Sequence, residues 1–245
     1  MPTTSTQAGA APTPKGLVSR FVGVLTSPRE TFQSIVAHPK WFGMLALTTL
    51  IIALFTALPM TTEAGRQAAL DQQVSSMEAF GMQVGDQQYE QMRRRMGIAP
   101  YTAGGSVLVI APIIALVISG ILFAVFNAAM GGEASFKQVF AVVVHAGVIS
   151  AASAVFTGPL NYARGATGSA TNLRVLLPMV DENSFIGRLF GMTDLFVIWW
   201  LVILAMGLGV LYRRRTQPIA TTLLGVYAVI ALCAAAVMSR FGGGS

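Results

Sequence analysis

The chain has 245 residues, of which 54% are hydrophobic and only 11% are charged. A soluble domain usually carries about 25% charged residues, so this composition disfavours an ordinary soluble enzyme. The formal net charge is +6, but the basic residues border long apolar runs and form no patch, so we expect no nucleic-acid partner. A single cysteine, Cys233, excludes an intramolecular disulfide, and two histidines leave no HExxH motif. We therefore expect no metal and no cofactor.

Two segments precede the first long apolar run. Residues 1–15 are rich in Thr, Ala and Pro and lack the pattern of a signal peptide, so we predict a disordered tail. Residues 16–40 are predicted to form two interfacial amphipathic helices that lie in the headgroup layer. Phe21 belongs to the apolar face of the first helix and Phe32 to that of the second. We favour a membrane anchor, and the alternative is that these faces dock a cytoplasmic partner.

The second of these helices has a clear start signal. Ser27 is predicted to be its N-cap, Pro28 its first helical residue and Glu30 the partner that completes a capping box. His38 and Pro39 are expected to end it.

Five stretches without charged residues follow along the chain. A hydrocarbon core about 30 Å thick needs about 20 apolar helical residues, so each stretch is long enough to cross a membrane once. A strand of a β-barrel would show short alternating segments, and a buried soluble helix would keep a polar stripe; neither pattern is present. We therefore predict an all-α polytopic membrane protein, a five-transmembrane-helix bundle within residues 41–240, with spans at about 41–60, 105–130, 138–160, 195–212 and 218–239.

The loop at 61–104 is the largest segment between spans. Residues 63–80 are rich in good helix formers, residues 81–86 suggest a turn, and a second helical stretch covers 87–96. We predict a helical hairpin outside the membrane. Near its end, Arg93, Arg94 and Arg95 are expected to face solvent or lipid headgroups, and an acidic partner is the less favoured reading.

The third span contains the small residues Gly147 and Ala151 at helical spacing. Small residues allow helix backbones to approach closely, so this span is predicted to form the bundle centre, although a homodimer seam would give the same pattern. His145 lies in the same span. We favour a neutral imidazole that is hydrogen-bonded for packing over one that handles a proton or ligand.

Other polar or helix-bending residues fall in or beside the spans. Asn127 is expected to hydrogen-bond between helices, and Pro112 is expected to kink the second span. Asp194 is expected to cap the fourth span. The rival interpretation is a small transporter or channel whose path is lined by His145 and Asn127, with the kink at Pro112. An intramembrane enzyme ranks last, because no nucleophile and base stand together in the sequence.

Orientation follows from the charges between spans. Lys and Arg are equally numerous on the two sides, but eight of the ten acidic residues fall on the side that carries the 61–104 loop. The bases before the first span and the run 213–215 favour a cytoplasmic amino terminus and an outer carboxyl terminus. All of the net charge of +6 then lies inside, so we expect attachment to anionic inner-leaflet lipids. Residues 241–245 are read as a flexible tail or linker.

Three short motifs occur in a fixed order: Phe21-Val-Gly-Val-Leu-Thr-Ser-Pro-Arg-Glu-Thr-Phe32, His38-Pro-Lys-Trp41 and Gly131-Gly-Glu-Ala-Ser-Phe-Lys-Gln138. With the pattern of spans, they resemble the bacterial branch of the Yip1 domain family over residues 17–239. The resemblance implies five spans and a cytoplasmic amino terminus. The eukaryotic branch binds prenylated Rab GTPases, but this chain lacks that branch's long acidic domain and its Asp-Leu-Tyr-Gly-Pro motif.

These observations together predict a non-enzymatic, multi-pass protein of the inner (plasma) membrane. We expect a scaffold, an accessory subunit or a membrane-organising protein. Its expected partners are the lipid bilayer and either another membrane protein or a second copy of itself.

Overall fold

The computed structural model describes residues 15–79, 81–129, 131–165, 170–177, 179–180 and 184–241. The predicted tails at 1–15 and 241–245 lie outside these residues, apart from residues 15 and 241.

Within the described residues, every named element is a helix, and one isolated β-bridge joins Asn172 to Asp194. The all-α prediction is therefore confirmed for this part of the chain. The elements are α1 (Leu17–Thr26), α2 (Pro28–Ala37), α3 (Phe42–Ala57), η1 (Pro59–Thr61), α4 (Glu63–Ala79), α5 (Asp86–Arg95), η2 (Met96–Ile98), α6 (Ala99–Phe123), the π-helix η3 (Ala124–Ala129), α7 (Phe136–Ala146), α8 (Val148–Arg164), η4 (Leu173–Leu176), α9 (Phe185–Met192), α10 (Leu195–Leu211) and α11 (Thr216–Phe241).

Four stretches of the described residues are long and apolar enough to cross a membrane: Phe42–Thr61, Asp86–Ala128, Phe136–Arg164 and Thr216–Arg240. They match four of the five predicted spans. The remaining predicted span corresponds to α10, an apolar helix of 17 residues. At 1.5 Å per residue it rises about 26 Å, slightly less than the hydrocarbon core. In length and composition these helices are those of a multi-pass membrane protein, and a fifth span stays a prediction.

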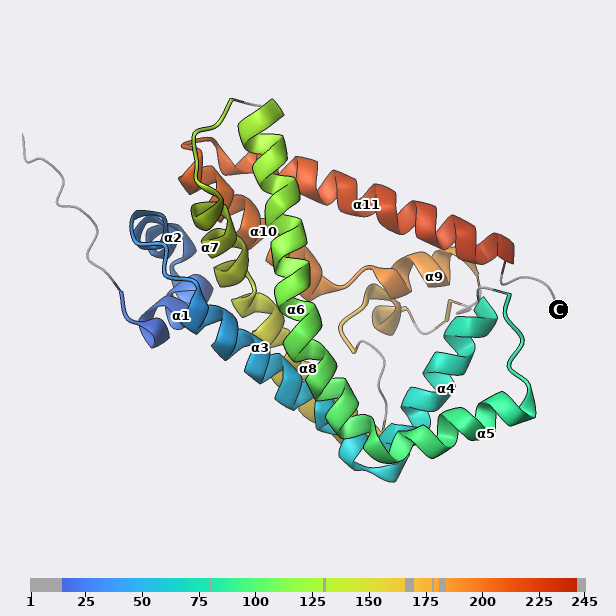
Figure 1. Ribbon diagram of the computed structural model, residues 1–245. Coiled ribbons are helices and arrows are strands. Elements are labelled where there is room, and N and C mark those ends of the chain that lie inside the picture. Colours follow the sequence, from blue (N-terminus) through green and yellow to red (C-terminus); the bar gives the residue numbers. More distant parts are fainter. Residues whose placement is uncertain are drawn as a thin grey trace, which may run out of the picture.

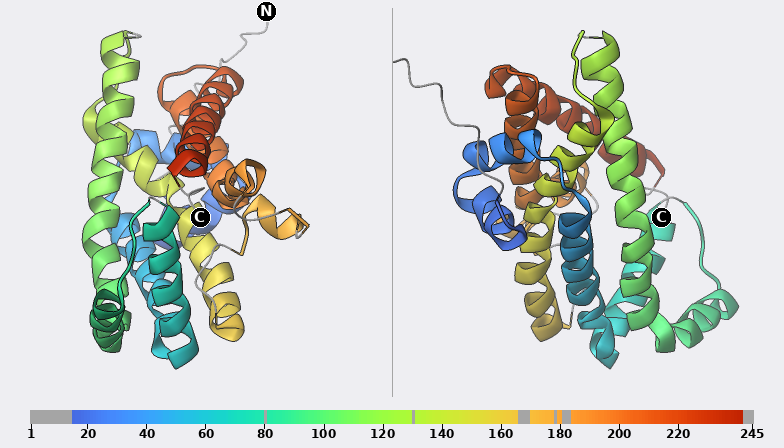
Figure 2. Two further views of the ribbon diagram at one scale, coloured as in Figure 1. Left: turned by 90° about the vertical axis from the view of Figure 1, so that its right-hand side faces the viewer. Right: turned by 60° about the vertical axis from the view of Figure 1, so that its left-hand side comes forward.

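The helices form a bundle with two distinct ends (Figure 1). α3 packs against both α6 and α8, and α6 stands along the outside of the bundle (Figure 2). The connection after α6 and the turn between α10 and α11 lie at one end, whereas the α4–α5 hairpin lies at the other. α11 leaves the bundle at a steep angle to α6 and contacts α9 and α10.

The stretch formed by α7 and α8 is the most buried of the four. In its most apolar part 61% of the residues are buried, compared with 28%, 11% and 17% for the other three stretches in chain order. α7 is buried on nearly all sides, because α2, α6 and α10 surround it. The prediction that the third span forms the bundle centre is therefore confirmed.

The helices before the first span differ from the prediction in two respects. Ser27 and Pro28 do begin α2, but Ser27 makes no side-chain cap hydrogen bond. Its backbone N–H donates instead to the Gly23 carbonyl at 2.9 Å, so the capping box with Glu30 is wrong, since that box needs the same N–H.

The second difference is the surroundings of α2. Phe32 and Ile35 are fully buried, and α2 packs against α7 and α10, so its apolar face meets protein. Of these two helices, α1 alone exposes large apolar side chains, with Val18 71% and Val22 49% exposed. An interfacial position therefore remains a prediction for the outer side of α1.

The predicted hairpin between the first two spans is present as α4 and α5. The Gln67 side-chain amide of α4 donates to the Tyr89 hydroxyl of α5 at 2.9 Å and ties the two helices together.

Candidate functional site

His145 lies near the end of α7 and is fully buried. Its Nδ1 lies 2.7 Å from the Ala141 carbonyl oxygen of the same helix. A carbonyl oxygen only accepts hydrogen bonds, so in the neutral imidazole Nδ1 carries the proton and Nε2 holds a lone pair. That Nε2 atom is buried without a hydrogen-bond partner among the described residues. His145 is therefore a core histidine with one unused acceptor.

Arg20 of α1 is a second polar residue buried within the bundle. Arg20 is only 4% exposed. Its Nε donates to the Lys15 carbonyl at 2.9 Å, and its Nη1 donates to the Lys40 carbonyl at 3.2 Å. Burial lowers the pKa of Arg20 from its ordinary value. Arg20 thus ties the start of α1 to the segment between α2 and α3.

Asn127 is held at the end of the bundle opposite the hairpin. Its Nδ2 donates to the Ala134 carbonyl at 2.6 Å, and its Oδ1 accepts from the Tyr212 hydroxyl at 2.7 Å. The Tyr212 ring stacks on Phe126 with centroids 4.8 Å apart. Gly132 leaves room for the Tyr212 ring, since a Cβ at position 132 would lie 2.5 Å from Cε1 of Tyr212. Asn127 therefore fastens the end of α6 to the turn that follows α10.

Gly147 and Ala151 lie where α7 passes into α8. Gly147 interrupts the helix between Ala146 and Val148, and its carbonyl accepts from the Ala151 N–H at 3.1 Å. Ala151 is fully buried. Gly147 lines a crevice that Thr48 of α3 and Trp200 of α10 also border. Both residues thus lie at helix contacts.

Pro112 lies inside α6, which continues without a break from Ala99 to Phe123. It borders a surface hollow with Trp41 and Phe136. His145, Asn127 and Pro112 therefore have three separate surroundings, and the structure does not bring them together into one path.

Phe21 and Phe32 also differ in their surroundings. Phe21 is partly buried against the core, whereas Phe32 is fully buried. The Phe32 ring lies against Gly207 of α10 and is not available to a docking partner without movement of α2.

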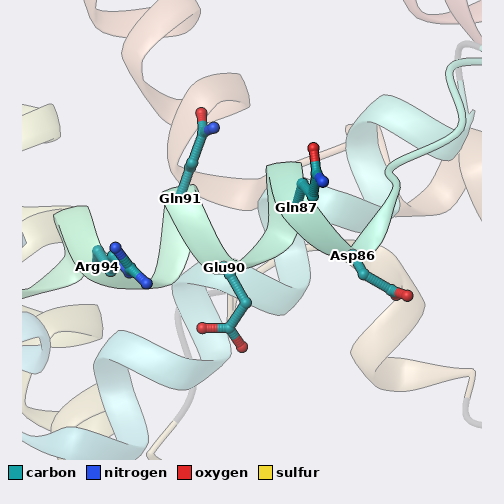
Figure 3. A pocket seen from close by; sticks show the side chains of 5 residues that line it. All are labelled: Asp86, Gln87, Glu90, Gln91 and Arg94. Atoms are coloured by element: carbon teal, nitrogen blue, oxygen red, sulfur yellow. The ribbon is translucent and has the colours of Figure 1, made fainter.

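Arg93, Arg94 and Arg95 end α5 and are all exposed. Nη1 of Arg93 lies 3.5 Å from Oε1 of Glu90, and such exposed pairs contribute little stability. Arg94 borders a surface hollow of about 360 Å³ together with Asp86, Gln87, Glu90 and Gln91 (Figure 3). This lining carries both signs of charge, so the hollow does not select strongly for an anion.

Asp194 caps α10 as predicted. Its Oδ1 accepts from the Phe196 N–H at 2.7 Å, and its Oδ2 accepts from the Thr171 hydroxyl at 2.7 Å. The Tyr227 hydroxyl of α11 donates to the Met192 carbonyl at 2.7 Å and joins α11 to the same corner. The Asp194 carboxylate therefore has a structural role as a helix cap.

Two features of these sites were missed from the sequence. The first is the buried, hydrogen-bonded Arg20, whose signal is a single charge within an otherwise apolar face. The second is a groove between α3 and α8, whose signal is the helical spacing of Ser150, Ser153 and Thr157. Among the described residues, no cluster of three or more His, Cys, Asp or Glu side chains is placed to hold a metal ion.

Comparison with known proteins gave one finding. A family model described as Yip1 domain matches residues 22–238, nearly the whole chain. Neither the curated proteins nor the solved structures gave a match.

Proposed function

The chain belongs to the Yip1 domain family, and from this we propose that it acts as a membrane scaffold, accessory subunit or membrane-organising protein. In this proposal it is not an enzyme and works through contacts of its helices and of the α4–α5 hairpin. It lies in a bacterial inner membrane with five spans, of which α10 is the fourth, and its amino terminus is cytoplasmic.

The observation that carries the proposal is an uncovered ridge on α11. A neighbouring face of α11 packs on α9 and α10 through Tyr227, Ala231 and Ala235. The ridge is exposed and follows helical spacing; its members are Thr221, Gly225, Ala228, Leu232 and Ala236. A Cβ added at Gly225 would meet nothing within 4 Å. Because helices in lipid associate through small residues, this ridge suits a second transmembrane helix.

The charge distribution supports a second contact, with lipid headgroups. At the end of the bundle assigned to the cytoplasm, exposed bases include Lys40, Lys137 and Arg213. Anionic inner-leaflet lipids attract such residues by about 1 kcal/mol each. We expect this attachment to weaken with added salt, since the Debye length falls as ionic strength rises.

The scaffold proposal is tested by extraction of the full chain in a gentle detergent, followed by mass spectrometry of what remains bound. We expect a membrane-protein partner or a second copy that is lost in the Gly225→Leu variant, since a bulky side chain would hold the helices apart. Val226→Leu is the matched control, because it replaces one exposed bulky residue with another on the same helix. Recovery of a bare monomer alone would contradict the proposal.

The alternative, a transporter or channel, rests on the unused Nε2 of His145. It predicts specific solute flux when the purified protein is placed in liposomes, and loss of that flux in His145→Ala. This result would overturn the scaffold proposal in favour of transport.

A further inference from the structure

A groove between α3 and α8 is not used by the proposed scaffold role. The wall formed by α3 and η1 is mostly apolar: it includes Ile52, Phe55, Pro59 and Met60, together with Thr56. The wall formed by α8 carries small polar side chains: Ser150, Ser153, Thr157 and Asn161. The groove has a volume of about 310 Å³, within the range of about 300 to 1,000 Å³ that is usual for ligand sites.

The groove is long as well as roomy. A crevice of about 210 Å³ shares Ile52 and Ser150 with it and continues to Thr48 and Trp200 near the bundle middle. From Thr48 to Pro59 the helix rises about 16 Å. One leaflet of a bilayer has a hydrocarbon thickness of about 15 Å. The groove therefore runs along the spans for about the depth of one leaflet, which fits an extended chain better than a compact solute.

The packing of α3 on α8 explains why this space stays open. A Cβ added at Gly158 would lie 2.8 Å from the Phe55 carbonyl oxygen, so the two backbones are in close contact there. Beside that contact the α8 side chains are too small to fill the gap. The Thr157 hydroxyl donates to the Ser153 carbonyl at 2.9 Å, back along its own helix. Ser150 is exposed, so the groove opens at the surface of the bundle.

Two arginines stand at the hairpin end of the groove. Arg66 donates from Nη1 to the carbonyls of Met60 and Thr61, at 3.2 and 3.1 Å, and Met60 is itself part of the lining. Arg164 is exposed and follows Asn161 by three residues, so it lies on the same side of α8. Arginine N–H groups bind phosphate oxygens well because of their planar, forked geometry.

We propose that the α3–α8 groove binds one anionic phospholipid, with an acyl chain along the groove and the phosphate at Arg66 and Arg164. The apolar wall of α3 matches the chain, and the positive charges match the phosphate. An apolar helix of a protein would leave both charges without a counterpart, so charge complementarity favours the lipid. This site does not depend on the scaffold role.

The test uses the purified full chain in a mild detergent, mixed with phosphatidylglycerol, with bound lipid counted by native mass spectrometry. Thr157→Leu fills the groove and is expected to lower bound lipid about fivefold or more, because the larger side chain occupies space that the acyl chain needs. Val155→Leu is the matched control, since Val155 is exposed on the same helix and does not line the groove. It should bind lipid as the unchanged protein does.

The headgroup end is tested separately with Arg164→Gln. Loss of one surface charge is expected to reduce the preference for phosphatidylglycerol over phosphatidylcholine about fivefold. Thermal unfolding shows whether each variant folds, and Ser153→Val replaces Thr157→Leu if the latter does not.

Three results would overturn the proposal. Equal lipid binding by Thr157→Leu and Val155→Leu would show that the groove is not the site. Displacement of the lipid by inorganic phosphate would indicate a site for the free anion. A disulfide between two copies of a variant that carries both Ser153→Cys and Cys233→Ser, so that the native exposed thiol cannot react, would indicate that a second copy of this chain occupies the groove.

Discussion

The ring of Phe32 in α2 lies directly against Gly207 in α10. A Cβ added at Gly207 would lie 2.9 Å from Cε1 of Phe32 and 2.6 Å from Cγ1 of Val142 in α7. Both neighbours are buried, and neither distance is compatible with a real side chain. Gly207 is therefore the point at which α2, α7 and α10 meet.

The first prediction follows from that contact. Gly207→Ala is expected to destabilise the folded protein by about 1 to 3 kcal/mol, because buried neighbours must shift to admit the methyl group. The change is measured as the midpoint of thermal unfolding in detergent, followed by tryptophan fluorescence. Gly120→Ala in α6 is the control, since a Cβ there would meet nothing within 4 Å. An unchanged midpoint for Gly207→Ala would contradict the packing of α2 into the bundle.

The second prediction concerns Asn127 and Tyr212. Tyr212→Phe removes the hydroxyl that donates to Asn127 at 2.7 Å but keeps the ring that stacks on Phe126. We expect a loss of about 0.5 to 1.5 kcal/mol, the usual net contribution of one hydrogen bond. Asn127→Ala and the double variant complete a cycle that isolates the pair. If the two losses are simply additive, the two side chains do not interact, and the proposed fastening of α6 to the turn after α10 fails.

The third prediction concerns Arg20. Arg20→Leu leaves the Lys15 and Lys40 carbonyls without the donor that they have now. A hydrogen bond that involves a charged group contributes about 1.5 to 3 kcal/mol, so the variant should unfold at a lower temperature. Arg29→Leu, an exposed arginine on α2, is the comparison and should have a much smaller effect. Faster proteolysis near α1 in the Arg20 variant alone would show that the loss is local.

The spans could be located from the sequence because charged residues are so costly in lipid. The third span was expected at 138–160, and α7 and α8 together cover Phe136–Arg164. The hairpin could also be predicted from the sequence, since α4 and α5 consist largely of good helix formers on either side of a turn. In both cases the signal is local along the chain.

The sequence does not show in the same way which segment packs against each helix face. The apolar face of α2 would look the same whether it met lipid or α10, since both surroundings are apolar. The partner of Asn127 is 85 residues away. α9 was not predicted, because its eight residues include Arg188 and fall short of the length that marks a span. These features depend on contacts between distant segments.

The last prediction concerns topology and the role of α10. Arg95 ends α5, and Arg215 lies between α10 and α11. The α4–α5 hairpin and the turn between α10 and α11 lie at opposite ends of the bundle (Figure 1). We expect alkaline phosphatase to be active when it is fused after Arg95, and a fluorescent protein to fold when it is fused after Arg215, because the first site is outside and the second is cytoplasmic. The two sites are separated by α6, by α7 with α8, and by α10. Three crossings place them on opposite sides, whereas two crossings place them on the same side. The same side for both fusions would therefore show that α10 does not cross the membrane, and opposite sides in the reverse sense would overturn only the cytoplasmic position of the amino terminus.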